Sequence, residues 1–224
     1  MTKVTSTTLL VIAKEPVPGR VKTRLTPPFS PAEAALLAEA ALTDTLRTVL
    51  TLPARRRVLV LEGRPGRWLP PGIEVVPQCA GGLDERLAAA FESCTGPTLL
   101  VGMDTPQITP ALLAPALDPA ARLGDDARLG DDAWFGPADD GGFWALGLAA
   151  PESAPPDLIR GVPMSVPETG AVQRRRLVDA GLTVRDLPPL RDVDSAADAE
   201  YVASAAPDGL FAATFRRLTE VGAR

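Results

Sequence analysis

The chain has 224 residues, of which 23 are Lys or Arg, 28 are Asp or Glu and none is His, so its formal net charge is −5. Without an imidazole, histidine catalysis and histidine-ligated metal are excluded. An acidic balance with clustered basic residues argues against a broad nucleic-acid-binding face. No apolar run approaches the roughly 20 residues that span a bilayer, and the N-terminus lacks a basic segment followed by a long apolar one. We therefore expect a cytoplasmic protein that binds neither membranes nor nucleic acid.

Length and composition predict one α/β domain over residues 1–224. One layered domain can absorb this length, and no linker-like tract divides the chain. The 46% apolar share with only 4% aromatic residues indicates a core built largely from Leu, Val and Ala. Two cysteines, Cys79 and Cys94, match neither a zinc-binding spacing nor a disulfide framework, so we expect ordinary reduced thiols.

Candidate strands and helices alternate along the chain. Strands are predicted at 8–13, 57–61, 73–76, 98–101, 133–136, 142–148 and 183–187. Helices are predicted at 31–50, 83–93, 109–117 and 168–180, and from Ser195 onward. Such alternation is typical of a mostly parallel sheet with helices on both faces, in three α/β/α layers. Ligands of such folds bind beyond the carboxyl ends of the strands.

Two of these helices begin with capping signals. Ser30 is followed by Pro31 and then by Glu33, which is a capping box with proline at the first helical position. Ser195 opens the last predicted helix, with Asp198 as its third helical residue. A stripe of leucines in the first helix is expected to face the core: Leu36, Leu37, Leu42, Leu46 and Leu50.

A tandem duplication, Ala-Arg-Leu-Gly-Asp-Asp at 121–126 and again at 127–132, is interpreted as an inserted surface loop. Its four aspartates could hold a metal, but a solvated acidic turn is the simpler reading.

A basic loop follows the first predicted strand. Its cations are Lys14, Arg20, Lys22 and Arg24. Two prolines restrict the backbone of this loop, and Gly19 permits a close backbone approach to a ligand. Lysine and arginine supply point-charge and forked contacts to phosphate oxygens. The loop therefore predicts a polyphosphate site, and the alternative is a solvated basic loop.

Carboxylates occur where further strands end. Asp104 follows the apolar strand near residue 100, and Asp194 precedes the helix that Ser195 opens. Mg²⁺ prefers one or two carboxylates together with phosphate oxygens and water. Asp104 and Asp194 are therefore predicted metal ligands, although Asp104 could instead form a helix cap or a turn. Asp192 is interpreted as a turn residue.

A further motif, GPADDGGFW at 136–144, joins two predicted strands. Its Asp139 and Asp140 precede the glycine pair Gly141 and Gly142, which would let the backbone come close to a ligand. The same residues could form only a tight hairpin turn.

In their order, these motifs resemble the bacterial DUF2064 family, also labelled rSAM/selenodomain-associated transferase 1, of the GT-A nucleotide-diphospho-sugar transferase superfamily. The resemblance covers nearly the whole chain. The N-terminal part of the chain also looks like 2-phospholactate guanylyltransferase. It rests on AKEPVPGRVKTRL at 13–25, Gln78 with GGLDERLAAAF at 81–91, GMDTP at 102–106, GPADDGGFWALG at 136–147, GVPMS at 161–165 and DVDS at 192–195. The family usually has tyrosine and tryptophan where this chain has Phe143 and Met164.

The resemblance implies a GT-A fold with the nucleotide over the carboxyl edge of the sheet. The implied nucleotide- and phosphate-binding residues are Lys14, Gly19, Arg20, Lys22, Arg24, Gln78, Gly81 and Gly82. Asp104 and Asp194 would hold Mg²⁺ or Mn²⁺, and Lys22 and Asp104 would be catalytic. The Asp140-Gly141-Gly142 turn would contact a sugar or an acceptor.

Three functions remain open. The leading one is Mg²⁺-dependent nucleotidyl transfer from an NTP to a small phosphorylated acceptor, because a triphosphate carries more charge than a nucleotide diphosphate sugar and suits the cationic loop. The alternatives are glycosyl transfer from an NDP-sugar and a nucleotide sensor without turnover. A dinucleotide-dependent oxidoreductase fits less well, since no Gly-x-Gly-x-x-Gly follows the first strand.

Overall fold

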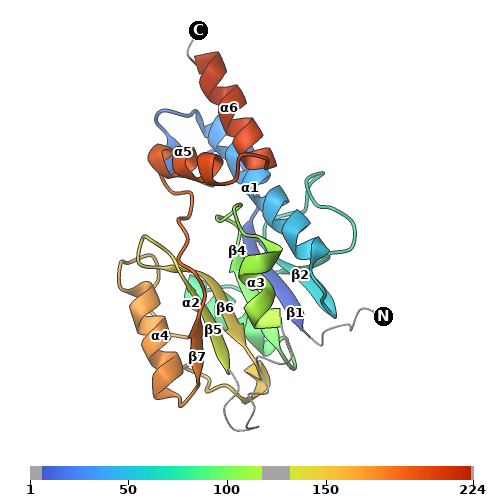
Figure 1. The fold of residues 1–224 in the computed structure, drawn as a ribbon, viewed down its shortest axis with the longest axis vertical. Coiled ribbons are helices and arrows are strands. Elements are labelled where there is room, and N and C mark those ends of the chain that lie inside the picture. Colours follow the sequence, from blue (N-terminus) through green and yellow to red (C-terminus); the bar gives the residue numbers. More distant parts are fainter. Residues whose placement is uncertain (1–6, 118–131, 223–224) are drawn as a thin grey trace.

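The computed structural model describes residues 7–117 and 132–222, and within them seven strands form one sheet in the order β3-β2-β1-β4-β6-β5-β7 (Figure 1). The strands are β1 (Thr8–Lys14), β2 (Arg56–Glu62), β3 (Glu74–Pro77), β4 (Thr98–Gly102), β5 (Ala133–Pro137), β6 (Phe143–Leu148) and β7 (Val184–Asp186). Only β6 runs antiparallel to its neighbours in this sheet. The mostly parallel sheet expected from the alternation is therefore confirmed. All but the last residue of the tandem duplication lies outside the described residues.

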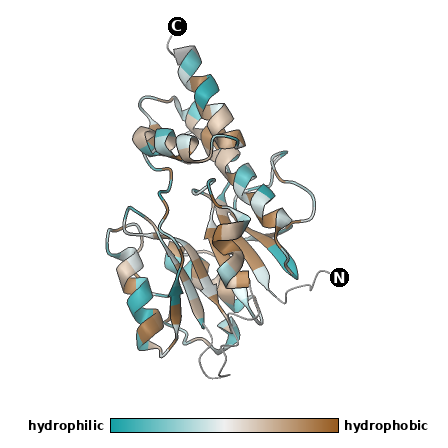
Figure 2. Ribbon diagram, viewed as in Figure 1, coloured by the Kyte–Doolittle hydropathy of each residue, from teal (hydrophilic) through white to brown (hydrophobic). Residues whose placement is uncertain are grey.

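Helices cover both faces of the sheet. They are α1 (Pro31–Thr51), α2 (Leu83–Glu92), α3 (Pro110–Leu117), α4 (Thr169–Asp179), α5 (Ala196–Ala205) and α6 (Leu210–Gly222), and short 3-10 turns lie at Thr23–Leu25 and Pro151–Ser153. Leu9 and Val11 of β1 pack with α1 and α3, whereas the intervening Leu10 packs with α2 and α4. This alternation follows from the two-residue period of a strand. In Figure 2 the strands are mostly brown, as is much of α3, whereas α4 carries more teal.

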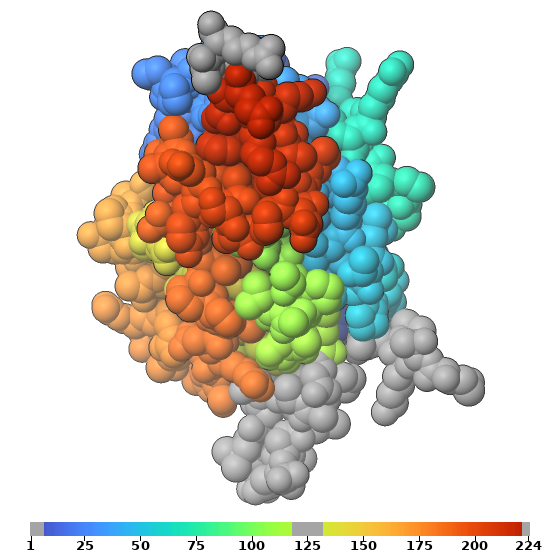
Figure 3. All heavy atoms as spheres, turned by 45° about the horizontal axis from the view of Figure 1, so that its top comes forward, coloured from blue at the N-terminus to red at the C-terminus, as the bar shows by residue number. Residues whose placement is uncertain are grey.

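A third apolar cluster lies beyond one end of the sheet, where α5 and α6 pack on the N-terminal half of α1. Leu37 of α1, Val202 of α5 and Phe211 of α6 are all buried in it. Figure 3 shows these C-terminal helices as one block beside α1 and α3. α6 was not among the helices predicted from the sequence.

The capping signals are confirmed, and one core assignment is wrong. The Ser30 side chain accepts a hydrogen bond from the Glu33 backbone, and Ser195 and Asp198 form the same kind of box at α5. Leu36, expected in the core, is 43% exposed. It precedes the fully buried Leu37, and one residue turns a helix by about 100°, which carries Leu36 away from the sheet.

Both cysteines are free thiols, Cys79 at the surface and Cys94 in the core. In residues 7–117 and 132–222, no helix combines the length and the apolar character that crossing a membrane requires.

Candidate active site

A cleft of about 640 Å³ opens at the carboxyl edge of the sheet. Lys14 at the end of β1 and Asp104 just after β4 line one side, because β1 and β4 are parallel neighbours in register. Asp140 and Gly142 of the β5–β6 turn and the segment Asp192–Asp194 line the other. The cleft thus lies beyond the carboxyl ends of the strands, as the alternation of strands and helices predicted.

A smaller cavity of about 230 Å³ adjoins the cleft and is formed by the basic loop. Its lining includes all four predicted cations: Lys14, Arg20, Lys22 and Arg24. Val21 and Leu25 are buried and fix the loop to the body of the protein. Gly19 has φ of +77°, which favours glycine at this turn. The structure therefore gathers the predicted phosphate-binding cations around one cavity.

Lys22 lies at the base of this cavity. Its Nζ is 2.9 Å from Oδ1 of Asp104 and 3.5 Å from Oδ1 of Asp194, and its side chain is only 8% exposed. Burial lowers the pKa of Lys22, but attraction to Asp104, Asp194 and Asp192 outweighs it, so the pKa is raised above its ordinary value. Lys22 is therefore a fixed cation.

The outer cations of the loop face solvent. The Lys14 side chain is 57% exposed and lies 3.7 Å from a carboxylate oxygen of Glu62. The Arg24 side chain is 74% exposed and donates to Oδ2 of Asp194 at 2.7 Å. Exposed pairs of this kind contribute little to stability, so both side chains can turn to an incoming anion.

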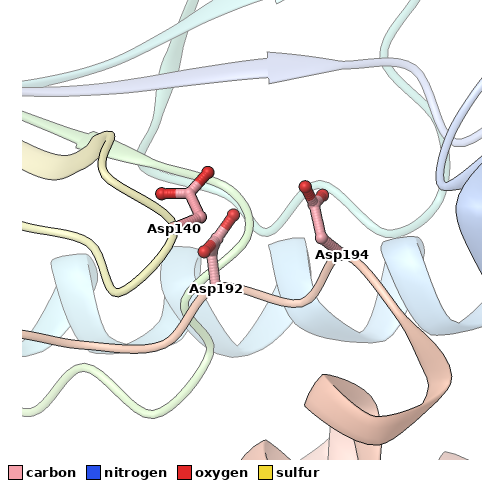
Figure 4. A group of neighbouring side chains, drawn as sticks. All are labelled: Asp140, Asp192 and Asp194. Carbon is pink, nitrogen blue, oxygen red and sulfur yellow. The ribbon is translucent and has the colours of Figure 1, made fainter. Parts of the chain in front are cut away.

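Three aspartates gather on one side of the cleft. Carboxylate oxygens of Asp140, Asp192 and Asp194 lie within 4.8 Å of one another. Figure 4 shows Asp140 on the β5–β6 turn and the other two on the segment before α5, with the carboxyl groups on the same side. The Asp104 carboxylate, a predicted metal ligand, is outside this group of three and pairs with Lys22.

Asp192 was interpreted from the sequence as a turn residue. In the structure it is also one of the three neighbouring aspartates of the cleft. Burial raises its pKa to about 6, and repulsion from Asp140 and Asp194 adds to the rise. A carboxylate that resists ionisation, as Asp192 does, would gain from a cation beside it. The three side chains together could hold one divalent ion, and carboxylate oxygens are ligands that Mg²⁺ or Mn²⁺ takes.

The Asp140-Gly141-Gly142 turn is held against the start of α4. Oδ1 of Asp140 accepts a hydrogen bond from the Gly142 backbone at 2.8 Å. Gly141 has φ of +89°, and a Cβ there would lie 2.0 Å from the carbonyl oxygen of Pro167. The close approach that Gly141 permits is thus to a loop of the protein itself, whereas Asp140 and Gly142 line the cleft.

Gln78 lines the cleft, and its side-chain amide already forms hydrogen bonds within the protein. Its Nε2 donates to the carbonyls of Ala13 at 2.8 Å and Val60 at 3.1 Å, and its Oε1 accepts from Arg86. Arg86 also donates to the carbonyl of Gly81 at 3.0 Å. Gln78 therefore braces the ends of β1 and β2. Gly81 and Gly82 lie beside this brace, and neither lines the cleft.

An apolar wall completes the cleft and was not predicted. It includes Leu83 of α2, and Met164 and Val166 in the loop before α4. Between the last two, Ser165 adopts φ of +60°, an uncommon conformation for a residue with a side chain. Single apolar residues in loops carry no sequence signal that distinguishes a cleft wall from the core, so only the structure reveals this surface.

The profile of a family described as "Uncharacterized protein conserved in bacteria (DUF2064)" matches residues 36–166, more than half of the chain. The chain belongs to this family. The resemblance drawn from the motifs of this DUF2064 protein is thereby confirmed. A comparison with curated proteins gives no match.

Solved structures share the fold of this DUF2064 protein. A candidate nucleotide-diphospho-sugar transferase from Desulfovibrio desulfuricans is 26% identical, with a TM-score of 0.79 over 97% of this chain and 95% of that one. A Mycobacterium homologue of Rv0371c is 20% identical, with a TM-score of 0.51 over 90% and 97% of the two chains. The 2-C-methyl-D-erythritol 4-phosphate cytidylyltransferase of Thermus thermophilus is 14% identical, with a TM-score of 0.51 over 92% and 100%.

Proposed function

We propose that this protein is a metal-dependent transferase with a nucleotide-activated donor, and that it transfers a nucleotidyl group from an NTP to a small phosphorylated acceptor. One observation carries the choice of donor: a cavity lined by four cations, together with Asp104 and Asp194, adjoins the cleft that Asp140 and Asp192 line. A nucleoside triphosphate has two phosphates beyond the one attacked, and such a cavity suits them. The sharing of a fold with a cytidylyltransferase agrees with this chemistry.

In this proposal the metal site is Asp140, Asp192 and Asp194. Asp194 remains a proposed metal ligand, as the sequence predicted. Asp104, the other predicted ligand, instead pairs with Lys22 in this proposal. A divalent ion held there would neutralise charge that develops on the phosphates during transfer. Asp140 reaches this site from the β5–β6 turn, so the predicted acceptor-side motif and the metal site meet in one place.

The residues of the basic loop hold and orient the donor. Lys14, Arg20 and Arg24 bind the β and γ phosphates, and Gly19 lets the backbone turn toward them. Lys22, held by Asp104, adds a fixed positive charge at the base. Gln78 lines the cleft where the nucleoside would lie, and Arg86, which donates to the Gly81 carbonyl, supports Gln78 from behind. An acceptor oxygen beside Gly142 attacks the α phosphorus in line, the bond to the β phosphate breaks, and pyrophosphate remains with the cations.

Glycosyl transfer is the second candidate, and a specific observation favours it. The relative that is 26% identical over nearly the whole chain is described as a candidate nucleotide-diphospho-sugar transferase. The same cations would then bind a diphosphate that leaves with the nucleoside, and Asp140 would contact the sugar. A nucleotide sensor would use the same pocket without turnover.

Product analysis separates these functions. The protein is incubated with each NTP, and separately with NDP-sugars, in the presence of Mg²⁺ or Mn²⁺ and a pool of phosphorylated acceptors. Release of pyrophosphate supports nucleotidyl transfer, whereas release of a nucleoside diphosphate from an NDP-sugar supports glycosyl transfer. A ligand that raises the melting temperature without either product supports the sensor.

Variants of the basic loop supply the control for binding. Lys14→Ala together with Arg24→Ala removes two exposed cations of the cavity, and we expect the thermal shift by the donor to be lost. Arg64→Ala removes an exposed cation of the β2–β3 loop, which does not line either cavity, and should leave the shift unchanged. Equal shifts in both variants would contradict the assignment of the phosphate site.

A further inference from the structure

Lys22 differs from the other cations of the basic loop in its enclosure. Its side chain is 8% exposed, against 57% for Lys14 and 74% for Arg24. Its ammonium lies between two carboxylates, 2.9 Å from Asp104 and 3.5 Å from Asp194. The outer cations face solvent, and Lys22 faces acids of the protein.

The backbone fixes this arrangement. Lys22 adopts φ of 48° and ψ of 39°, a left-handed conformation that costs free energy for a residue with a side chain. The backbone of Leu25 donates to the Lys22 carbonyl at 3.0 Å, and the fully buried Leu25 holds this turn in place. A conformation that the surrounding structure maintains against strain places the ammonium in a defined position.

We infer that Lys22 is a built-in counter-ion of Asp104 and Asp194, which fills the position that a second divalent cation would otherwise take. The protein then binds a single divalent ion at Asp140, Asp192 and Asp194, and this part of the inference rests on the proposed function. An ion entering between Asp104 and Asp194 would have to displace an ammonium that has little access to water. An enclosed charge without its partners is costly.

Lys22 also has a defined place beside the donor. An ammonium has three N–H donors. With Nζ 2.9 Å from Asp104 and 3.5 Å from Asp194, two of these donors can serve the carboxylates, which leaves one for the cavity that Lys22 lines. Lys22 can therefore add a contact to a phosphate oxygen without leaving its carboxylates.

Metal counting tests this inference without any substrate. The number of Mn²⁺ ions bound per chain is measured by the electron paramagnetic resonance signal of free Mn²⁺ and by titration calorimetry. We expect one ion for the unmodified protein and for Lys22→Arg, which keeps the charge. We expect two ions for Lys22→Met, and one again when Asp104→Asn is added to Lys22→Met. Lys22→Gln is measured alongside, with circular dichroism to verify folding.

The outcomes separate the inference from the proposed metal site. The inference is overturned if the unmodified protein binds two ions. It is also overturned if neither Lys22→Met nor Lys22→Gln binds more ions than the unmodified protein. One ion that is lost in Asp140→Asn supports the site of three aspartates, whatever Lys22→Met shows. No ion in the unmodified protein but one in Lys22→Met supports the counter-ion and contradicts the site of three aspartates.

Discussion

The backbone N–H of Val193 donates a hydrogen bond of 3.0 Å to the carbonyl of Asp104. This bond ties the segment before α5 to the end of β4. Val193 is buried in the cluster between α1, α5 and α6, while its two neighbours, Asp192 and Asp194, line the cleft. The buried Val193 anchors this short segment, and the carboxylates on either side of it are held at the cleft.

Asp192→Asn is expected to stabilise the protein near neutral pH. The folded pKa of Asp192 is about 6, above its ordinary 3.8, so the folded state binds the proton more tightly than the unfolded chain does. The free energy of unfolding therefore falls as pH rises from about 4 to about 6, and the full penalty is present above that range. An amide removes this penalty. We expect the melting temperature to rise by about 2–4 °C at about pH 7.5, or roughly 1 kcal/mol.

The pH dependence supplies the check on this effect. At about pH 4 both forms carry little charge at this position, so the gain should disappear. Asp179→Asn, an exposed aspartate near the end of α4, is the matched control and should show no such pH-dependent gain. Melting is recorded without divalent ions, because a bound cation would offset the repulsion. A gain that is equal at both pH values would contradict the raised pKa.

Gly141→Ala is expected to destabilise the protein through a clash as well as through backbone strain. Gly141 and Gly181 have similar φ, +89° and +79°. A Cβ at Gly141 would meet the Pro167 carbonyl at 2.0 Å, whereas a Cβ at Gly181 meets nothing within 4 Å. Gly181→Ala therefore measures the strain alone, about 1–2 kcal/mol. We expect Gly141→Ala to lower the melting temperature by a further 4–8 °C or so, for a clash of roughly 2 kcal/mol. Equal losses in thermal melting would show that the turn can move away from Pro167.

Gln78→Met is expected to weaken the protein even without a ligand. The amide of Gln78 serves the carbonyls of Ala13 and Val60, and methionine would leave both without this donor. Unpaired polar groups of this kind cost about 1–3 kcal/mol. Lys14→Met, at an exposed side chain of the same cleft, should change the free energy of unfolding by less than about 0.5 kcal/mol. Urea unfolding measures the stability of both variants. Equal free energies of unfolding would mean that the Gln78 amide is available to bind a nucleotide.

Much of the fold could be predicted from the sequence because its signals are local. Apolar strands that are buried on both faces appear as unbroken runs, and a capping box needs only four adjacent residues, as at Ser30 and Glu33. α6 was missed although Phe211, Phe215 and Leu218 recur at helical spacing. Leu36 was misassigned because a run of leucines does not show which members face the sheet.

The site could be predicted only in part, because its geometry depends on distant segments. Position after a strand was enough to select Asp104 and Asp194, and the charge of the basic loop was enough to select Lys22. The sequence could not show that Lys22 would pair with Asp104, since this contact depends on a left-handed backbone. Asp192 was not selected because its environment comes from Asp140 on another element.

The capping box of α5 is expected to serve the metal site, and the box of α1 provides a matched control. Ser195 follows Asp194 directly, and its hydroxyl accepts from the backbone of Asp198. Ser195→Ala and Ser30→Ala each remove one capping hydroxyl, and each should cost about 0.5–2 kcal/mol of stability. Of the two capped helices, α5 starts next to the aspartates and α1 does not. Ser195→Ala, but not Ser30→Ala, should therefore weaken Mn²⁺ binding in titration calorimetry. Equal Mn²⁺ affinities in the two variants would show that Asp194 is held by its own contacts with Lys22 and Arg24 and not by the start of the helix.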